Sequence, residues 1–174
     1  MSLHLKMDAQ RRQLIRLAPA GLLWRSGGWG SALSLFARPA LANDRLPRAE
    51  SWAPTLAQGA RAGQPVMVLW GTPGCPWCAA LRAEVIIHVW REASQRGVQV
   101  FEFDLTDRTP LRQQPEVSPA ALARQLGIRV SPTVSFHGPG GELAERLVGY
   151  ASRDFYPAYL DERLAQARTR LKGA

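Results

Sequence analysis

The sequence predicts an α/β domain in which a central mixed β-sheet is flanked by helices. The five-residue apolar run at 66–70 is bounded by Pro65 and Gly71, which is typical of a buried strand. Residues 133–136 and 142–148 flank a Gly-Pro-Gly-Gly turn, which is typical of a hairpin. Amphipathic helical patterns separate and follow these strands. The predicted order is therefore β-α-β-α-β-β-α, without an internal repeat.

Length and composition fit one globular domain with an additional segment. The chain has 174 residues, 46% of them hydrophobic and 21% charged, which is typical of folded soluble proteins rather than disordered ones. No stretch reaches the roughly 18 consecutive apolar residues of a membrane-spanning helix, so a polytopic membrane protein is excluded. Two cysteines are too few for a disulfide-rich scaffold or a four-sulfur zinc site.

The basic excess lies mainly at the start of the chain. The formal net charge is +8, and the isoelectric point is about 10.7. Residues 1–42 carry six basic and one acidic side chain, whereas the remaining 132 residues carry 16 basic and 13 acidic ones. Interspersed charges of both signs are typical of a solvated surface, so we expect no nucleic-acid partner.

Residues 1–42 have the order of an export signal. A basic start with Arg11 and Arg12 precedes a moderately apolar stretch and the small residues Ala40 and Ala42, as in a secretory leader. The adjacent arginines resemble a twin-arginine signal. We expect cleavage after Ala42 and a periplasmic location. The alternatives are an uncleaved leader that tethers the protein to a membrane, or an N-terminal helix packed on the domain.

The first half of the mature chain is expected to surround the cysteines with a strand and a helix. Residues 43–63 form a linker with a short helix over 55–62, and the domain proper spans residues 64–174. After the strand at 66–70, a four-residue repeat predicts an amphipathic helix of about five turns. Residues 98–105 form a second inner strand. The repeat consists of Leu81, Val85 and Val89.

The second half is expected to add a helix, the hairpin and a final helix. Residues 106–117 form a loop. Ser118 and Pro119 then supply an N-cap and a first-position proline for a helix that ends at Gly127. Ser152 is expected to cap the last helix, which has one apolar face. That face consists of Tyr156, Leu160, Leu164, Ala167 and Leu171.

The chemistry is expected at Cys75-Pro76-Trp77-Cys78, directly after the first strand and at the start of a helix. Unpaired N–H groups and the helix dipole favour an anion there, and the pKa of the first cysteine in such motifs can fall to roughly 3.5–7.5. Cys75 is therefore the expected nucleophile. Cys78, one helical turn later, would attack the mixed disulfide and release the substrate. Pro76 is tolerated in a first turn, and Trp77 would offer an apolar surface to the substrate.

These features resemble the thioredoxin superfamily over roughly residues 64–171. The resemblance rests on the Cys-Pro-Trp-Cys motif, on Val130-Ser131-Pro132-Thr133 before the hairpin, and on Gly149 after it. It implies a thioredoxin fold, a cis Pro132 that faces the redox pair, and a backbone edge at Ser131 and Pro132 that binds an extended substrate. Within the superfamily, the chain looks most like periplasmic thioredoxin-related reductases of the sulfur-oxidation type, SoxW and SoxS. This finer resemblance rests on the long segment after the second strand, on the Arg-Val-Ser-Pro-Thr run, and on Val148-Gly149-Tyr150 followed by Asp154-Phe155.

The sequence departs from that family at two positions. Gly74 replaces the usual tryptophan before the first cysteine, and Leu69 stands in the place of a buried acid that helps to deprotonate the resolving thiol. Glu102, on the neighbouring strand, is a candidate substitute for this acid. The favoured interpretation of Glu102 is nevertheless a solvated strand residue.

Two other interpretations of the cysteine pair are a structural disulfide and half of a metal site. A metal would need two further ligands, and His88 and His137 are the remaining histidines of the mature chain. Both are interpreted as surface residues. We therefore expect no metal and no bound cofactor.

The sequence thus predicts an exported thiol:disulfide oxidoreductase that reduces protein disulfides or other cysteine-bearing substrates. A reductase in an oxidising compartment has to be recharged, and the resemblance implies a membrane thiol transporter as electron donor. A disulfide-forming oxidase and a non-catalytic module that binds thiol-bearing clients are the alternatives. The protein is expected to be a monomer.

Overall fold

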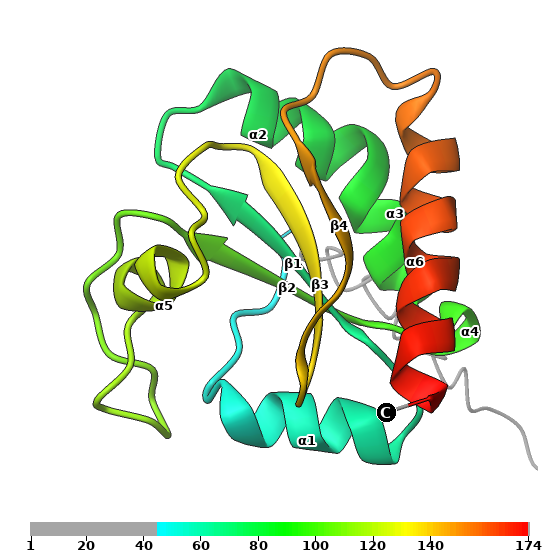
Figure 1. Cartoon of the computed structure of the whole chain (residues 1–174). Helices are drawn as coiled ribbons and strands as arrows, with labels where there is room; N and C mark the ends of the chain where they lie inside the picture. The colour runs from blue at the N-terminus through cyan, green and yellow to red at the C-terminus, as the bar shows by residue number, and fades with distance from the viewer. Residues whose placement is uncertain (1–44, 174) are drawn as a thin grey trace, which may run out of the picture. The chain divides into compact units, whose positions relative to one another are not determined.

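A four-stranded mixed sheet forms the centre of the described part of the chain (Figure 1). The computed structural model describes residues 45–173, so the expected export signal lies outside it. The strand order is β2-β1-β3-β4, with β1 parallel to β2 and antiparallel to β3, and β3 antiparallel to β4. The predicted mixed sheet is confirmed. The bounds are β1 (Val66–Gly71), β2 (Gln99–Asp104), β3 (Thr133–Gly138) and β4 (Gly141–Val148).

Helices cover both faces of this sheet (Figure 1). None of those within residues 45–173 is both long and apolar enough to cross a membrane. The short helix expected at 55–62 is present as α1. The bounds are α1 (Ala53–Arg61), α2 (Pro76–Leu81), η1 (Arg82–Ile86), α3 (Ile87–Arg91), α4 (Ala93–Arg96), α5 (Pro119–Gln125) and α6 (Tyr156–Lys172).

Strand β1 divides its side chains between two hydrophobic cores, because successive residues of a strand point to opposite faces. Met67 and Leu69 pack with residues of η1, α3 and α6. Val66, Val68 and Trp70 pack with residues of α1 and α5. All six residues of β1 are buried, so the strand that leads to the cysteines is held from both sides.

The helix after the cysteines differs from the regular helix of about five turns that the repeat predicts. A π-helical segment, η1, lies between α2 and α3. A π turn has more residues than an α turn, and here it lets three consecutive residues face the core. Val85, Ile86 and Ile87 are all buried, whereas a regular α-helix turns by 100° per residue and would direct one of them outward.

Of the two helix caps expected from serine, one is confirmed and one is wrong. Ser118 caps α5, since its Oγ accepts a hydrogen bond of 3.3 Å from the N–H of Ala121. Ser152 does not cap α6, because that helix begins at Tyr156 and Ser152 Oγ instead accepts a bond of 3.1 Å from the Asp154 N–H. The expected face of α6 is nevertheless correct, and its buried members are Tyr156, Leu160, Leu164 and Ala167.

His137 is buried rather than on the surface, with an exposed fraction of 1%. It lies on the interior strand β3 opposite Val66 of β1, and the ring of Trp52 packs edge-on against it at a centroid distance of 5.0 Å. Ser135 Oγ lies 2.7 Å from His137 Nε2 and accepts a hydrogen bond of 2.7 Å from Trp70 Nε1. Burial, together with the positive charge of Arg146, lowers the pKa of His137 to about 4.

Candidate active site

Cys75 and Cys78 are joined by a disulfide bond, with their Cα atoms 5.3 Å apart. After β1 ends at Gly71, the chain turns through Gly74, whose positive φ of 72° suits glycine,. Cys75 occupies the N-cap position of α2 and Pro76 follows in its first turn. The Cys75 Sγ accepts a hydrogen bond of 3.1 Å from the Cys78 N–H. The expected place of the pair, between a buried strand and a helix, is confirmed.

The two sulfur-bearing residues differ in exposure. Cys78 is 1% exposed, whereas Cys75 is only partly buried. The intervening Trp77 is 59% exposed. A molecule that approaches the pair from solvent would therefore meet Cys75 and the Trp77 ring before it met Cys78.

The segment that contains Ser131 and Pro132 lies beside the turn at residues 71–74, which leads from β1 to Cys75. The Ser131-Pro132 peptide bond is cis, as the family resemblance implies. The hydroxyls of Thr72 and Ser131 lie 3.0 Å apart, and the Gly149 N–H donates a bond of 2.8 Å to the Pro132 carbonyl. Hydrogen bonds thus join the turn before the cysteines, the Ser131-Pro132 segment and Gly149, which are far apart in the sequence.

Exposed apolar side chains lie within or next to these motifs in the sequence. Val130 directly precedes Ser131 and is 53% exposed, while Val148 pairs with Thr133 and is 58% exposed. We call the three exposed residues Trp77, Val130 and Val148 the apolar rim. Large apolar side chains that remain exposed around a reactive group are suited to binding another molecule.

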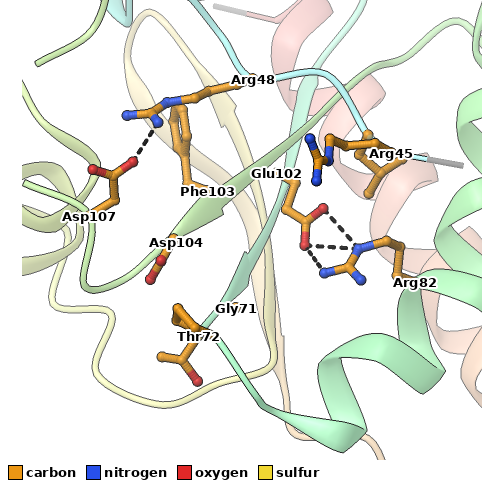
Figure 2. A pocket seen from close by; sticks show the side chains of 11 residues that line it. Arg45, Arg48, Gly71, Thr72, Arg82, Glu102, Phe103, Asp104 and Asp107 are labelled. Carbon is orange, nitrogen blue, oxygen red and sulfur yellow. Dashed lines mark hydrogen bonds and ion pairs between the residues drawn. The ribbon is translucent and has the colours of Figure 1, made fainter. Parts of the chain in front are cut away.

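A charged pocket of about 410 Å³ borders the turn that leads to the cysteines (Figure 2). It is lined by Gly71, Thr72 and Pro73 of that turn and by charged residues of both signs. Arg48 is ion-paired with Asp107, and Arg82 with Glu102. The sequence did not single out this pocket, because its walls come from the segment at 45–48, from β2 and from η1.

A family model described as a thioredoxin-like domain matches residues 53–164. The chain belongs to this thioredoxin-like family. The predicted fold class and the superfamily are thereby confirmed. With its Cys-x-x-Cys pair, this thioredoxin-like protein is a thiol:disulfide oxidoreductase,.

Solved thioredoxin structures are similar to the chain. The periplasmic thioredoxin SoxS from Paracoccus pantotrophus is 23% identical, with 60% of this chain and 99% of that one covered and a TM-score of 0.44. Thioredoxin NaTrxh from Nicotiana alata is 19% identical, with coverages of 69% and 93% and a TM-score of 0.49. The Malassezia sympodialis thioredoxin Mala s 13 is 17% identical, with coverages of 71% and 90% and a TM-score of 0.49. No curated protein sequence matches the chain.

Glu102 of this thioredoxin-like domain is not the solvated residue that the sequence favours. Its side chain is 17% exposed, and both carboxylate oxygens accept hydrogen bonds from Arg82 Nε, at 3.0 and 2.9 Å. A further bond joins Arg82 Nη2 to Glu102 Oε1. The hydrogen bond to Glu102 raises the pKa of Arg82, so the guanidinium stays charged. Sequence reasoning missed Arg82, although its position one helical turn after Cys78 could have suggested it.

Proposed function

We propose that this thioredoxin-like protein is a reductase of protein disulfides. In the reduced protein, the Cys75 thiolate attacks one sulfur of a substrate disulfide, forms a mixed disulfide and releases the first substrate thiolate. The Cys78 thiolate then attacks Cys75 Sγ, which restores the Cys75–Cys78 bond and releases the second substrate thiolate. Two electrons pass from the dithiol to the substrate.

The surroundings of Cys75 support the reductase direction. Strong thiol oxidants owe their potential to a well-stabilised thiolate in the reduced form. Within residues 45–173, one hydrogen bond reaches Cys75 Sγ, and Pro76 has no N–H to offer as a second donor,. Arg82, four residues after Cys78, is paired with Glu102. So few N–H donors around Cys75 support a thiolate that is only modestly stabilised in the reduced protein, which favours donation of electrons, and this is the observation that carries the proposal.

The Ser131-Pro132 segment supports a protein substrate. Within the described residues, neither the N–H nor the C=O of Ser131 has a backbone partner, whereas the Pro132 carbonyl is bonded to Gly149. A free backbone edge can pair with an extended peptide, while adjacent apolar side chains hold its side chains. We assign this binding role to Ser131, Pro132 and the apolar rim, with Pro76 at the start of α2 beside them.

Trapping the mixed disulfide tests the proposed roles. A Cys78→Ser variant should accumulate a covalent complex with a protein disulfide through Cys75, because the second attack is blocked. A Cys75→Ser variant, the matched control, should form none. A binding module without turnover would give no covalent complex in either variant. The unaltered protein would then also fail to reduce a disulfide.

The equilibrium potential against glutathione separates a reductase from an oxidase. We expect a value below about −200 mV, in the range of reducing thioredoxin-fold proteins. A value near about −120 mV, typical of strong thiol oxidants, would contradict the reductase direction while leaving the trapping result intact.

The place of action is proposed to be the periplasm. The basic start of residues 1–42, the adjacent Arg11 and Arg12, and the small residues at Ala40 and Ala42 support export with cleavage after Ala42,. A dithiol in an oxidising compartment is consumed by each turnover. A membrane thiol transporter is therefore the proposed electron donor, with a monomeric protein as its acceptor.

A further inference from the structure

The second attack requires the Cys78 thiol to lose its proton, and this thiol is buried. The strand that leads to the cysteines offers no acceptor, because Leu69 on β1 is apolar and fully buried. The direct neighbour of Leu69 in the parallel ladder is Glu102 of β2. A carboxylate is therefore present on the neighbouring strand, directly beside Leu69, the residue that stands in the place of the buried acid.

The alternation of the sheet places this carboxylate on the same side as the cysteine helix. Met67 and Leu69 of β1 and Val100 of β2 pack in the core formed with η1 and α3. Since side chains two residues apart share a face, Gly71 and Glu102 lie on that same face. Figure 2 shows Glu102 directed toward Arg82 of η1, on the side of β2 that this helical segment covers.

Gly71 leaves space between the sulfur and the carboxylate. A Cβ atom at Gly71 would lie 3.6 Å from Cys78 Sγ and 3.8 Å from Glu102 Oε1. Both atoms therefore border the space beside Gly71, and a water molecule in that space would connect them by hydrogen bonds. Gly71 and Glu102 also line the charged pocket, so water and protons from solvent would reach this space through it.

Charged groups from three parts of the chain surround Glu102. From η1, Arg82 binds both of its oxygens. From the segment before α1, Arg45 and Arg48 reach the same pocket, and from the end of β2 and the following turn come Asp104 and Asp107 (Figure 2). Arg48 is paired with Asp107, so the guanidinium of Arg82 is the charge in direct contact with Glu102.

We propose that Glu102 accepts the proton of the Cys78 thiol through one water molecule in the resolving step, and that Arg82 is the residue that positions it. This inference rests on the proposed roles of Cys75 and Cys78. The Cys78 S–H bond breaks as its proton passes to the Glu102 carboxylate. The resulting thiolate attacks Cys75 Sγ and expels the substrate thiolate. The proton then leaves Glu102 for that thiolate or for solvent through the pocket.

The two attacks can be timed separately with dithionitrobenzoate. The reduced full-length protein releases one coloured thiolate when Cys75 forms the mixed disulfide and a second when Cys78 resolves it. Glu102→Gln keeps the size of the side chain and an oxygen for Arg82 but cannot take up the proton. At neutral pH we expect an unchanged first release and a second release slowed tenfold or more, because a positioned general base contributes at least that much.

The pH dependence of the second release distinguishes loss of a proton acceptor from a folding defect. Hydroxide can remove the Cys78 proton without Glu102, so the second-release rates of Glu102→Gln and the unaltered protein should converge at alkaline pH. Glu102→Asp, which keeps a carboxylate, should recover part of the neutral rate. Asp104→Asn is the matched control, since it removes another carboxylate of the same pocket, and it should leave both releases unchanged.

Gly71→Ala tests the path while leaving the Glu102–Arg82 pair in place. The added methyl group would make ordinary contacts with Cys78 and Glu102, but it would narrow the space beside Gly71 through which the proposed water connects them. It should slow the second release as Glu102→Gln does, and the double variant should be no slower, because both changes interrupt one path.

Two results would overturn the proposal. One is a Glu102→Gln second release within twofold of the unaltered rate at neutral pH. The other is an equal slowing by Asp104→Asn. Cys78→Ser distinguishes this from failure of the proposed function: it should give the first release alone. If Cys78→Ser still gives both releases, the assigned cysteine roles fail and the inference fails with them.

Discussion

The hydrogen bonds of His137 select one protonation pattern. Trp70 Nε1 can only donate, so Ser135 accepts from it and directs its own hydroxyl proton to His137 Nε2. The neutral imidazole fits this arrangement because its Nε2 then acts as acceptor. A protonated ring would place a second donor against Ser135 in a buried site, in keeping with the pKa of about 4.

This burial predicts that stability falls as the pH falls from about 6.5 to about 4. In that window the unfolded chain takes up a proton at residue 137 that the folded chain does not, so the free energy of unfolding rises with pH. The loss should reach up to about 3 kcal/mol at pH 4 and should not grow further below it. Urea unfolding at pH 7, 5.5 and 4 measures it.

The matched comparison uses the two histidines of the described chain. His137→Gln should flatten the pH dependence in this window, whatever its stability at pH 7. His88→Gln should leave the slope unchanged, because His88 is exposed. An equal slope in the unaltered protein and in His137→Gln would contradict the assignment.

Single residues were predicted from the sequence where local rules decide their surroundings. Cys75 and Pro76 follow from the requirements of a helix start, and both lie where the sequence places them. His137 and Glu102 were misjudged because their burial depends on distant partners. Trp52 covers His137 from another part of the chain, and Arg82 reaches Glu102 from the cysteine helix.

At the level of elements, the two serine caps provide a direct test of local chemistry. Ser118 Oγ satisfies an otherwise unpaired N–H in the first turn of α5, whereas Ser152 lies before the start of α6. Ser118→Ala should lower the free energy of unfolding by about 1 kcal/mol. Ser152→Ala should change it by less than about 0.5 kcal/mol, as for an ordinary surface substitution.

Thermal or urea unfolding of the two serine variants measures both values under the same conditions. Equal losses would mean that Ser152 supports α6 after all or that the Ser118 bond contributes nothing.

The elements themselves followed from periodicity and turn residues, and their order was confirmed. The π-helical segment was not predictable in this way, because a four-residue repeat does not reveal where three successive apolar residues will all be buried.

At the level of the whole molecule, the segment before α1 belongs to the folded domain. Leu46 and Ala49 lie in the two hydrophobic cores, and the Pro47 carbonyl accepts a hydrogen bond of 2.9 Å from the Glu102 N–H. The sequence predicts a linker there because charged residues and prolines interrupt any periodicity. The tertiary contacts that order it come from β2 and the sheet, which no local pattern indicates.

This organisation gives the proposed export step a structural consequence. Cleavage after Ala42 would leave a product that begins at Asn43 and keeps every described residue, including the core residues Leu46 and Ala49. A shorter chain that begins at Ala53 lacks Leu46 and should lose at least about 2 kcal/mol, the usual cost of removing a buried leucine side chain. N-terminal sequencing of the exported protein identifies the cut, and urea unfolding compares the chains. An exported product that retains Arg11 and Arg12 would contradict the cleavage, and a cut within residues 45–52 would contradict its position.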